Sequence, residues 1–218
     1  MFVITADQVG SRTDRDRAGE IIAGLEADFG AAFALPPDQT SGDEIQVMMT
    51  DAQAALGVIL ALHRTGYWSV GLGVGGVRVP LPASTRQAAG GAFVAARAAV
   101  TRAKKADARF ALDVAPEVPA TAAGSPDGPV LDADEVEAIL SMLLLVRQRR
   151  SAEGWQAVDL LQRGVSQQEI AVRLGISAAA VSQRIKSALW RVEEAVRPAL
   201  VRLLENLDRA TSEMEPAA

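Results

Sequence analysis

The sequence predicts an α+β domain followed by an all-α domain, and three observations support this. In the first half of the chain, short apolar runs typical of strands alternate with amphipathic patterns of helical period. A segment with four prolines and two glycines then interrupts the pattern, and only helical spacing follows it. Because 218 residues can build two modest cores, we predict an α+β domain over 1–113, a linker over 114–130 and a helical domain over 131–218.

The N-terminal domain is expected to contain one sheet covered by helices. A hairpin is predicted at Gly42-Asp43 and a turn at Pro36-Pro37-Asp38, because these residue types favour turns. The predicted strands are at 2–6, 44–50 and 109–114, with further apolar runs at 31–35 and 68–79, and the predicted helices are at 14–29, 52–64 and 86–105.

The C-terminal domain should contain helices only. Its first helix is predicted over 132–150, since acids cluster at the start and Arg147, Arg149 and Arg150 at the end, as the helix dipole favours. Three helices joined by short turns are expected next. A final helix over 187–209 is expected to be kinked by Pro198.

Composition narrows the class of protein. The chain has no cysteine, which fits a reducing compartment and predicts a cytoplasmic protein without disulfides. Its N-terminus lacks a basic segment typical of a signal peptide, and no apolar run approaches the roughly 18 residues that span a bilayer. The net charge is −5, but residues 163–191 carry five basic side chains against one acidic one. This local excess is typical of a small DNA-binding unit.

Residues 166–185 predict two short helices joined by a tight turn. Ser166 and Glu169 have the spacing of a capping box, Gly175 can adopt the left-handed conformation that ends a helix, and Ser177 can cap the next one. The apolar contacts between the two helices are assigned to Ile170, Leu174, Ile176, Val181 and Ile185, with the small Ala171 allowing a close approach. Together with a supporting helix ending at Gly164, this predicts a helix-turn-helix over 155–191.

One face of the second helix is suited to contact bases. At 100° per residue from Val181, the side chains of Ala179, Gln183, Lys186 and Trp190 point away from the core. Glutamine can form two hydrogen bonds with adenine, alanine can make an apolar contact with a thymine methyl group, and lysine can donate to guanine or to a phosphate. The predicted DNA-binding set is Gln167, Ser177, Ala179, Ser182, Gln183, Arg184, Lys186 and Arg191. The alternative is a helical hairpin used only for packing or dimerisation.

The segment 166–191 resembles the helix-turn-helix of sigma-factor region four and of LuxR-type regulators. The likeness lies in the Ile-Ala-x-x-Leu-Gly-Ile-Ser core that begins at Ile170, followed by Val181 and Ile185. The resemblance implies binding to double-stranded DNA. One short recognition helix makes few contacts, so a homodimer that binds two half-sites is expected.

Asp7 and Asp43 are candidate metal ligands in the N-terminal domain. Asp7 ends the first predicted strand and Asp43 lies at the predicted hairpin tip. Two such carboxylates on adjacent strands can hold Mg²⁺ against substrate phosphates, because hard cations prefer oxygen ligands. The alternative is that each acid caps a turn.

Residues 1–113 resemble the palm-like domain of class III nucleotide cyclases and GGDEF proteins, which implies a ferredoxin-like fold. The likeness includes the glycine-rich run 70–76 and the segment 90–97, where Arg97 matches a family arginine and implies a nucleotide contact. Phe93 occupies the position of the family asparagine, so we do not expect catalysis. The motif over 3–12 and the order of the domains are similar to the SatD family of bacterial proteins.

The leading functional hypothesis is a sequence-specific, dimeric transcriptional regulator whose N-terminal domain senses a nucleotide. A second hypothesis is a Mg²⁺-dependent nucleotide-processing enzyme regulated by its helical domain. A third is a sigma-like factor that contacts RNA polymerase through the helix at 132–150.

Overall fold

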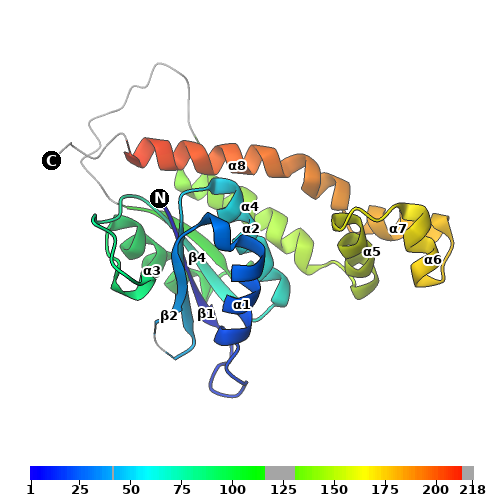
Figure 1. The fold of residues 1–218 in the computed structure, drawn as a ribbon. Coiled ribbons are helices and arrows are strands. Elements are labelled where there is room, and N and C mark those ends of the chain that lie inside the picture. The colour runs from blue at the N-terminus through cyan, green and yellow to red at the C-terminus, as the bar shows by residue number, and fades with distance from the viewer. Residues whose placement is uncertain (41, 116–130, 213–218) are drawn as a thin grey trace. The chain divides into compact units, whose positions relative to one another are not determined.

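The computed structural model describes residues 1–40, 42–115 and 131–212. It is an α+β protein with a five-stranded mixed sheet and several helices (Figure 1). No helix among the described residues is long and apolar enough to cross a membrane. Nearly all of the predicted linker over 114–130 lies outside the described residues.

The sheet has the strand order β2-β3-β1-β4-β5. The central strand β1 is antiparallel to β3 and β4, β2 is antiparallel to β3, and β5 is parallel to β4. This arrangement is compatible with a ferredoxin-like domain extended by one strand. The elements in chain order are β1 (Phe2–Gln8), α1 (Ala18–Phe29), η1 (Gly30–Ala32), β2 (Phe33–Gln39), β3 (Glu44–Met49), α2 (Ala52–Thr65), β4 (Trp68–Val74), η2 (Thr85–Gln87), α3 (Gly91–Ala103) and β5 (Phe110–Val114).

The predicted elements of this region are largely confirmed, with three differences. The helix predicted over 86–105 is shorter, because residues 85–87 form the separate short helix η2 and α3 begins only at Gly91, after Gly90 with a φ of 147°. Helix α1 begins at Ala18 rather than at 14, because residues 10–14 form a turn in which Thr13 and Asp14 donate to the Gly10 carbonyl. The predicted turn at Pro36-Pro37-Asp38 is wrong, since these residues belong to β2. An edge strand tolerates prolines, and the β2–β3 register shifts across this segment.

Helices cover the two faces of the sheet. In Figure 1, α1 and α2 lie on one side and α3 on the other. Val3 of β1 packs with Ala92, Phe93 and Ala96 of α3. Because side chains alternate along a strand, Asp7 lies on the same face as Val3. The α3 side of the sheet therefore presents Asp7 at the end of β1.

Helix α3 packs very close to β4, which explains the glycine-rich run of the sequence. A Cβ atom on Gly71 would lie 2.2 Å from the Val100 backbone nitrogen, and one on Gly73 would lie 2.1 Å from the Ala92 carbonyl oxygen. Neither position has space for a larger side chain. The glycines serve helix–sheet contact and do not form a phosphate-binding loop.

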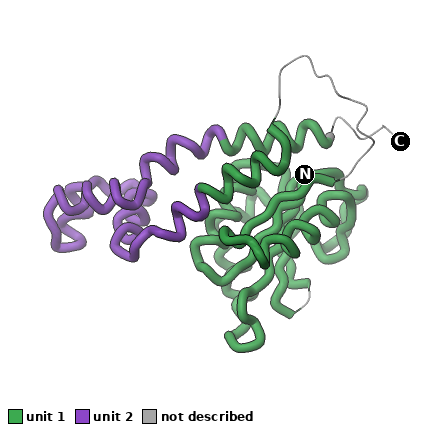
Figure 2. The backbone as a smooth tube through the Cα atoms, turned by 180° about the vertical axis from the view of Figure 1, so that it is seen from behind, with its two compact units in different colours: residues 1–142, 200–218 green, residues 143–199 purple. Residues whose placement is uncertain are grey.

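The remaining helices are α4 (Ala133–Gln148), α5 (Ala152–Gln162), α6 (Gln167–Leu174), α7 (Ala178–Ser187) and α8 (Trp190–Ser212). The chain divides into unit 1, residues 1–142 and 200–218, and unit 2, residues 143–199 (Figure 2). Helix α8 continues without a break past Pro198, where a kink was expected. The prediction of a separate domain over 131–218 differs from this division.

Hydrogen bonds explain why parts of α4 and α8 belong to unit 1. Glu137 of α4 accepts a hydrogen bond from the Leu112 backbone N–H of β5 at 2.7 Å, and it also forms an ion pair with Arg102 at 2.9 Å. Asp208 of α8 is paired with the amino group of Met1. These partners are distant in sequence, so helical spacing alone could not reveal them.

Candidate nucleic-acid interface and candidate ligand pocket

The core of unit 2 holds three short helices together. Ala157 of α5, Ile170 of α6 and Val181 and Ile185 of α7 form one buried cluster. The partly buried side chains that pack against it are Leu160, Leu161, Val165, Ala171, Leu174, Ile176 and Trp190. The apolar contacts predicted between α6 and α7 are therefore confirmed.

The ends of α6 and α7 have the predicted local geometry. The Ser166 hydroxyl accepts from the Glu169 backbone N–H at 3.3 Å, and the Glu169 carboxylate accepts from the Ser166 N–H at 3.0 Å. The pKa of Glu169 is held below its ordinary value by hydrogen bonds from Ser166. The larger effect comes from the Ser166 hydroxyl, which donates at 2.7 Å, and the smaller one from its backbone N–H. Gly175 has a φ of 64°, and the Ser177 hydroxyl accepts from the Ala180 N–H at 3.1 Å. The capping box, the left-handed glycine and the second cap are all confirmed.

The side of α7 opposite its buried residues is polar and exposed. Ala179, Ser182, Gln183 and Lys186 are exposed along this helix. The Gln183 amide donates to the Ser187 hydroxyl at 3.2 Å, so it is held along the helix surface. Ser177 is exposed at the N-cap of α7, while Gln167 is half-buried at the start of α6. We call the four exposed α7 residues the α7 outer face.

Trp190 does not belong to the α7 outer face. Helix α7 ends at Ser187, and Leu189 has a φ of 52°, so the 100° spacing used for the prediction stops before Trp190. Trp190 packs against the unit 2 core instead, and the Arg197 guanidinium lies 5.6 Å from its ring centroid. The expectation that Trp190 points away from the core is therefore wrong.

The basic side chains of 163–191 differ in how far they are exposed to solvent. Arg163, Arg173 and Arg191 are exposed, as is Lys186. Arg184 is half-buried, and its charge acts on Glu153 of α5. The pKa of Glu153 is lowered first by a hydrogen bond from its own backbone N–H, then by one from Ser151, and also by the charge of Arg184. Arg184 is therefore less available to a phosphate than the exposed arginines.

A buried ionic cluster in unit 2 was not predicted. Glu193 is fully buried and is paired with Arg147, with Arg150 at 2.7 Å and with Arg197 at 2.7 Å. Burial opposes the ionisation of Glu193, but the charge of Arg147 and hydrogen bonds from Arg197 and Arg150 outweigh it and hold its pKa below the ordinary value.

Three further contacts fix the arginines of this cluster. The Trp155 ring of α5 lies 4.2 Å from the Arg150 guanidinium and 4.9 Å from that of Arg147. Arg150 also donates to the Ala188 carbonyl at 3.0 Å. From the sequence, Arg147 and Arg150 were expected only to interact favourably with the helix dipole. Their three-residue spacing and the Glu193–Arg197 spacing of four were the available signals.

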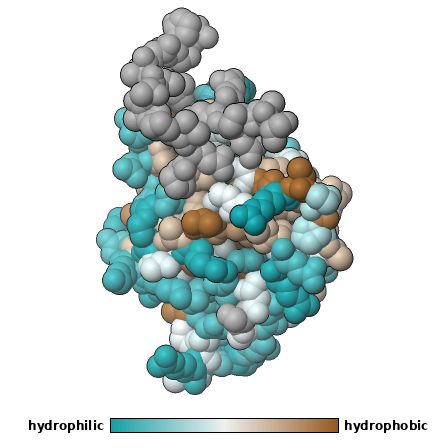
Figure 3. Space-filling model, turned by 90° about the vertical axis from the view of Figure 1, so that its left-hand side faces the viewer, coloured by the Kyte–Doolittle hydropathy of each residue, from teal (hydrophilic) through white to brown (hydrophobic). Residues whose placement is uncertain are grey.

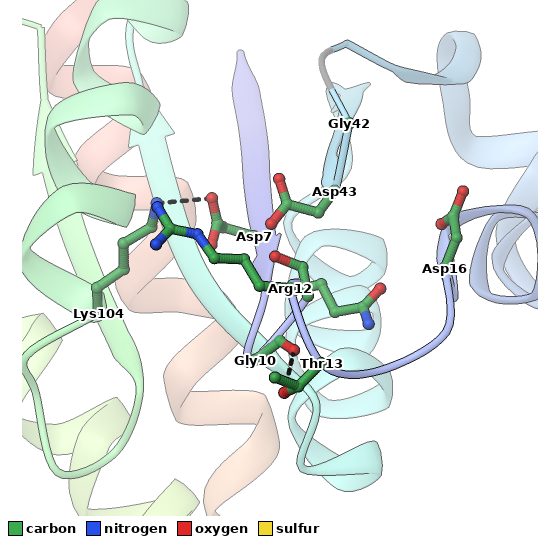
Figure 4. Close-up of a pocket in the computed structure, with 10 residues that line it drawn as sticks. Asp7, Gly10, Arg12, Thr13, Asp16, Gly42, Asp43 and Lys104 are labelled. Carbon is green, nitrogen blue, oxygen red and sulfur yellow. Dashed lines mark hydrogen bonds and ion pairs between the residues drawn. The ribbon is translucent and has the colours of Figure 1, made fainter.

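In unit 1, Asp7 and Asp43 line the same pocket. Its volume is about 770 Å³, and Figure 4 shows the two aspartates together beside the loop that follows β1. The hairpin position is fixed because the Gln8 N–H donates to the Asp43 carbonyl at 3.0 Å. The lining residues are Asp7, Gln8, Gly10, Ser11, Arg12, Thr13, Asp16, Gly42, Asp43 and Lys104.

The pocket contains a cation, Lys104, that was not predicted from the sequence. The Lys104 ammonium lies 2.6 Å from the Asp7 carboxylate (Figure 4). The third acid, Asp16, accepts hydrogen bonds from the Ala18 N–H at 2.8 Å and from Gln39 at 3.3 Å. The pocket is thus a mixed site of acids and bases, assembled from the β1 end, the β2–β3 turn and the end of α3.

The structure does not bring Arg97 to this pocket. Arg97 is exposed on α3, seven residues before Lys104, which is about 10 Å along a helix axis. Phe93 is 9% exposed and packs with Val3 and Met48. Neither residue lines the pocket. From α3 and its C-terminal end, the pocket lining includes Lys104.

A second hollow beside the start of α3 is a poorer candidate site. It measures about 410 Å³, and its lining includes Gly76, Gly90, Gly91 and one charged residue, Arg78. The α3 side of the molecule shows small apolar areas separated by polar ones (Figure 3). Because its walls are mostly backbone and small side chains, this hollow offers few groups that could recognise a charged ligand.

No protein-family model matches this chain, and neither does any curated protein or solved structure. Two candidate sites in the structure therefore indicate the function. One is the α7 outer face in unit 2, and the other is the Asp7–Asp43 pocket in unit 1.

Proposed function

We propose that this protein is a sequence-specific DNA-binding transcriptional regulator in which α6 and α7 form the helix-turn-helix. The α7 outer face carries the proposal: it exposes Ala179, Gln183 and Lys186 on a helix anchored through Val181 and Ile185. The resemblance to sigma-factor region four and LuxR-type regulators supports it. The absence of cysteine supports a cytoplasmic location, and the motif over 3–12 supports SatD family membership.

The chemistry of the α7 outer face matches the major groove. Gln183 can donate to and accept from adenine, Ala179 can contact a thymine methyl group, and Lys186 can donate to guanine. Ser177 and Ser182 offer hydroxyl groups beside these residues. A helix anchored on its apolar side presents these groups at fixed positions, which base recognition requires.

Phosphate contacts would come from the exposed arginines around the helix pair. Arg163, Arg173 and Arg191 are exposed in this unit although the whole chain has a net charge of −5. Each phosphate contact adds about −0.9 to the slope of log affinity against log salt concentration. A small interface of this kind gains affinity by pairing, so the proposed DNA-bound form is a homodimer.

Selection of binding sites from random duplex DNA with the full chain tests this function. On the selected site, the double variant Gln183→Ala/Lys186→Ala should lose at least about tenfold in affinity at fixed salt, measured by fluorescence anisotropy. The matched control is Gln53→Ala/Lys105→Ala, which removes the same residue types from exposed positions in unit 1. Equal affinity of the α7 variant and the control would contradict the proposal.

A second candidate function is nucleotide sensing by unit 1, as a palm-like domain of ferredoxin-like fold. The specific observation is the convergence of Asp7, Asp43, Arg12 and Lys104 on one pocket. Ribose hydroxyls can bond carboxylates, and phosphates can bond the two bases. The test is isothermal titration of ATP, GTP and their cyclic monophosphates into the full chain. Binding by none of them would contradict this role.

A further inference from the structure

The Asp7–Asp43 pocket combines side chains from three segments that lie far apart in the sequence. Asp7 and Arg12 come from the end of β1 and the loop after it, Asp43 from the β2–β3 turn, and Lys104 from the end of α3 (Figure 4). All of them belong to unit 1. Their charges partly compensate, because two bases face the acids.

A magnesium ion between Asp7 and Asp43 does not fit the groups that are present. Mg²⁺ requires close octahedral oxygen ligation at about 2.0–2.1 Å, but the Lys104 ammonium already lies 2.6 Å from Asp7. A dication at this carboxylate would be placed against a like charge. Asp16 is engaged by Ala18 and Gln39. Across residues 1–40, 42–115 and 131–212, no group of three or more His, Cys, Asp or Glu is placed to hold a metal ion.

The pocket does offer groups that have no partner within the protein. In the described part of the chain, Ser11 and Arg12 make no hydrogen bond or ion pair through side chain or backbone, and the Asp43 carboxylate accepts none. An unpaired guanidinium, a hydroxyl group and two backbone N–H groups are the donors that phosphate oxygens accept from. The free carboxylate is an acceptor for a ligand hydroxyl group.

We propose that Lys104 takes the place of a metal ion in this pocket, which binds the phosphate groups of a nucleotide directly through Lys104, Arg12 and Ser11. The inference rests on the nucleotide-sensing role proposed for unit 1. Asp7 is the positioning residue that holds the Lys104 ammonium at the pocket wall. Asp43 accepts a hydrogen bond from a ribose hydroxyl. The pocket therefore needs no divalent cation, unlike the enzymes that its domain resembles.

Titrations of the full chain with ATP, GTP and tripolyphosphate, each in EDTA and in Mg²⁺, test this inference. The wild-type chain should bind at least one of the two nucleotides equally well in both buffers, and Mg²⁺ alone should give no binding heat. Tripolyphosphate should bind more weakly than the nucleotide, because it cannot use Asp43. Binding that requires Mg²⁺ would overturn this inference alone. Absence of ATP and GTP binding in both buffers would overturn this inference, and absence of cyclic monophosphate binding as well would overturn the sensing role with it.

Variants of Lys104 make the test specific. Lys104→Ala should lose about tenfold or more in EDTA, because a charged hydrogen bond is removed. It should also gain binding of Mg²⁺, since the Asp7 carboxylate is freed. Lys104→Arg should retain binding in EDTA, and Lys105→Ala, exposed at the next position and outside the pocket lining, should behave as wild type. Unchanged EDTA affinity in Lys104→Ala would contradict the assignment.

Discussion

The two candidate sites differ in how the chain builds them. The α7 outer face comes from one continuous segment, where Ser166, Gly175 and Ser177 set the helix ends and Val181 and Ile185 set the buried side. The pocket in unit 1 is assembled from three separate segments by strand pairing and helix packing. Local signals therefore suffice for the first site, while the second depends on tertiary structure.

The largest effect is expected from Glu193→Gln. This variant tests whether unit 2, like unit 1, also depends on contacts between residues distant in sequence. Glu193→Gln leaves three arginines without their carboxylate, and breaking a buried ionic cluster in this way costs about 3–5 kcal/mol. Urea unfolding should show the loss. The matched control is Glu194→Gln, whose half-exposed side chain should change stability by less than about 1 kcal/mol. Similar stability of both variants would mean that the local caps alone hold the helix pair.

A second variant tests whether the stability of unit 1 depends on the close packing of α3 against β4. In Gly73→Ala the new Cβ would lie 2.1 Å from the Ala92 carbonyl oxygen, so helix or strand must shift. We expect a loss of about 2–3 kcal/mol in the free energy of unfolding, typical of overpacking. Gly24→Ala in α1 is the control, because nothing lies within 4 Å of its Cβ. A Gly73→Ala chain as stable as the control would contradict the close approach.

The pH dependence of stability gives a smaller effect with a defined sign. The pKa of Glu193 is lowered from its usual value of 4.5, so its contribution is full above that unfolded value and is lost as pH falls through the lower folded value. Acid titration of unfolding midpoints should show this loss in the wild type. The unfolding midpoint should fall less steeply with decreasing pH in Glu193→Gln than in the wild type. If it falls equally steeply in both, the acid sensitivity comes from other carboxylates.

The smallest effect concerns the local signals of the helix pair. Ser166→Ala removes the capping hydroxyl of α6 and should cost about 1 kcal/mol. Ser182→Ala on the α7 outer face makes no cap and should be nearly neutral in stability. Thermal unfolding of the two variants measures the difference. Equal midpoints would show that packing of Ile170, rather than the cap, fixes the start of α6.

The same contrast explains what the sequence could predict. The caps, the glycine turn and the buried side of α7 follow from spacing within about twenty residues, and they were predicted. Trp190 was misplaced because one left-handed residue, Leu189, ended the helical period. In unit 1, Asp7 and Asp43 were recognisable from their strand-end positions, but Lys104 was not, because its ion pair spans 97 positions.

The close contact between α3 and β4 also has an entropic consequence. Gly71 and Gly73 meet the backbone of α3 at Ala92, Ala96 and Val100, and two of these three residues are alanines. Glycine and alanine have no side-chain rotamers to lose on folding, so this contact forms without that entropy cost. For the same reason, these glycines and alanines cannot change rotamer to accommodate a shift of α3 against β4. Lys104 can leave Asp7 by swinging its own side chain, but any larger displacement requires α3 to slide as a rigid body.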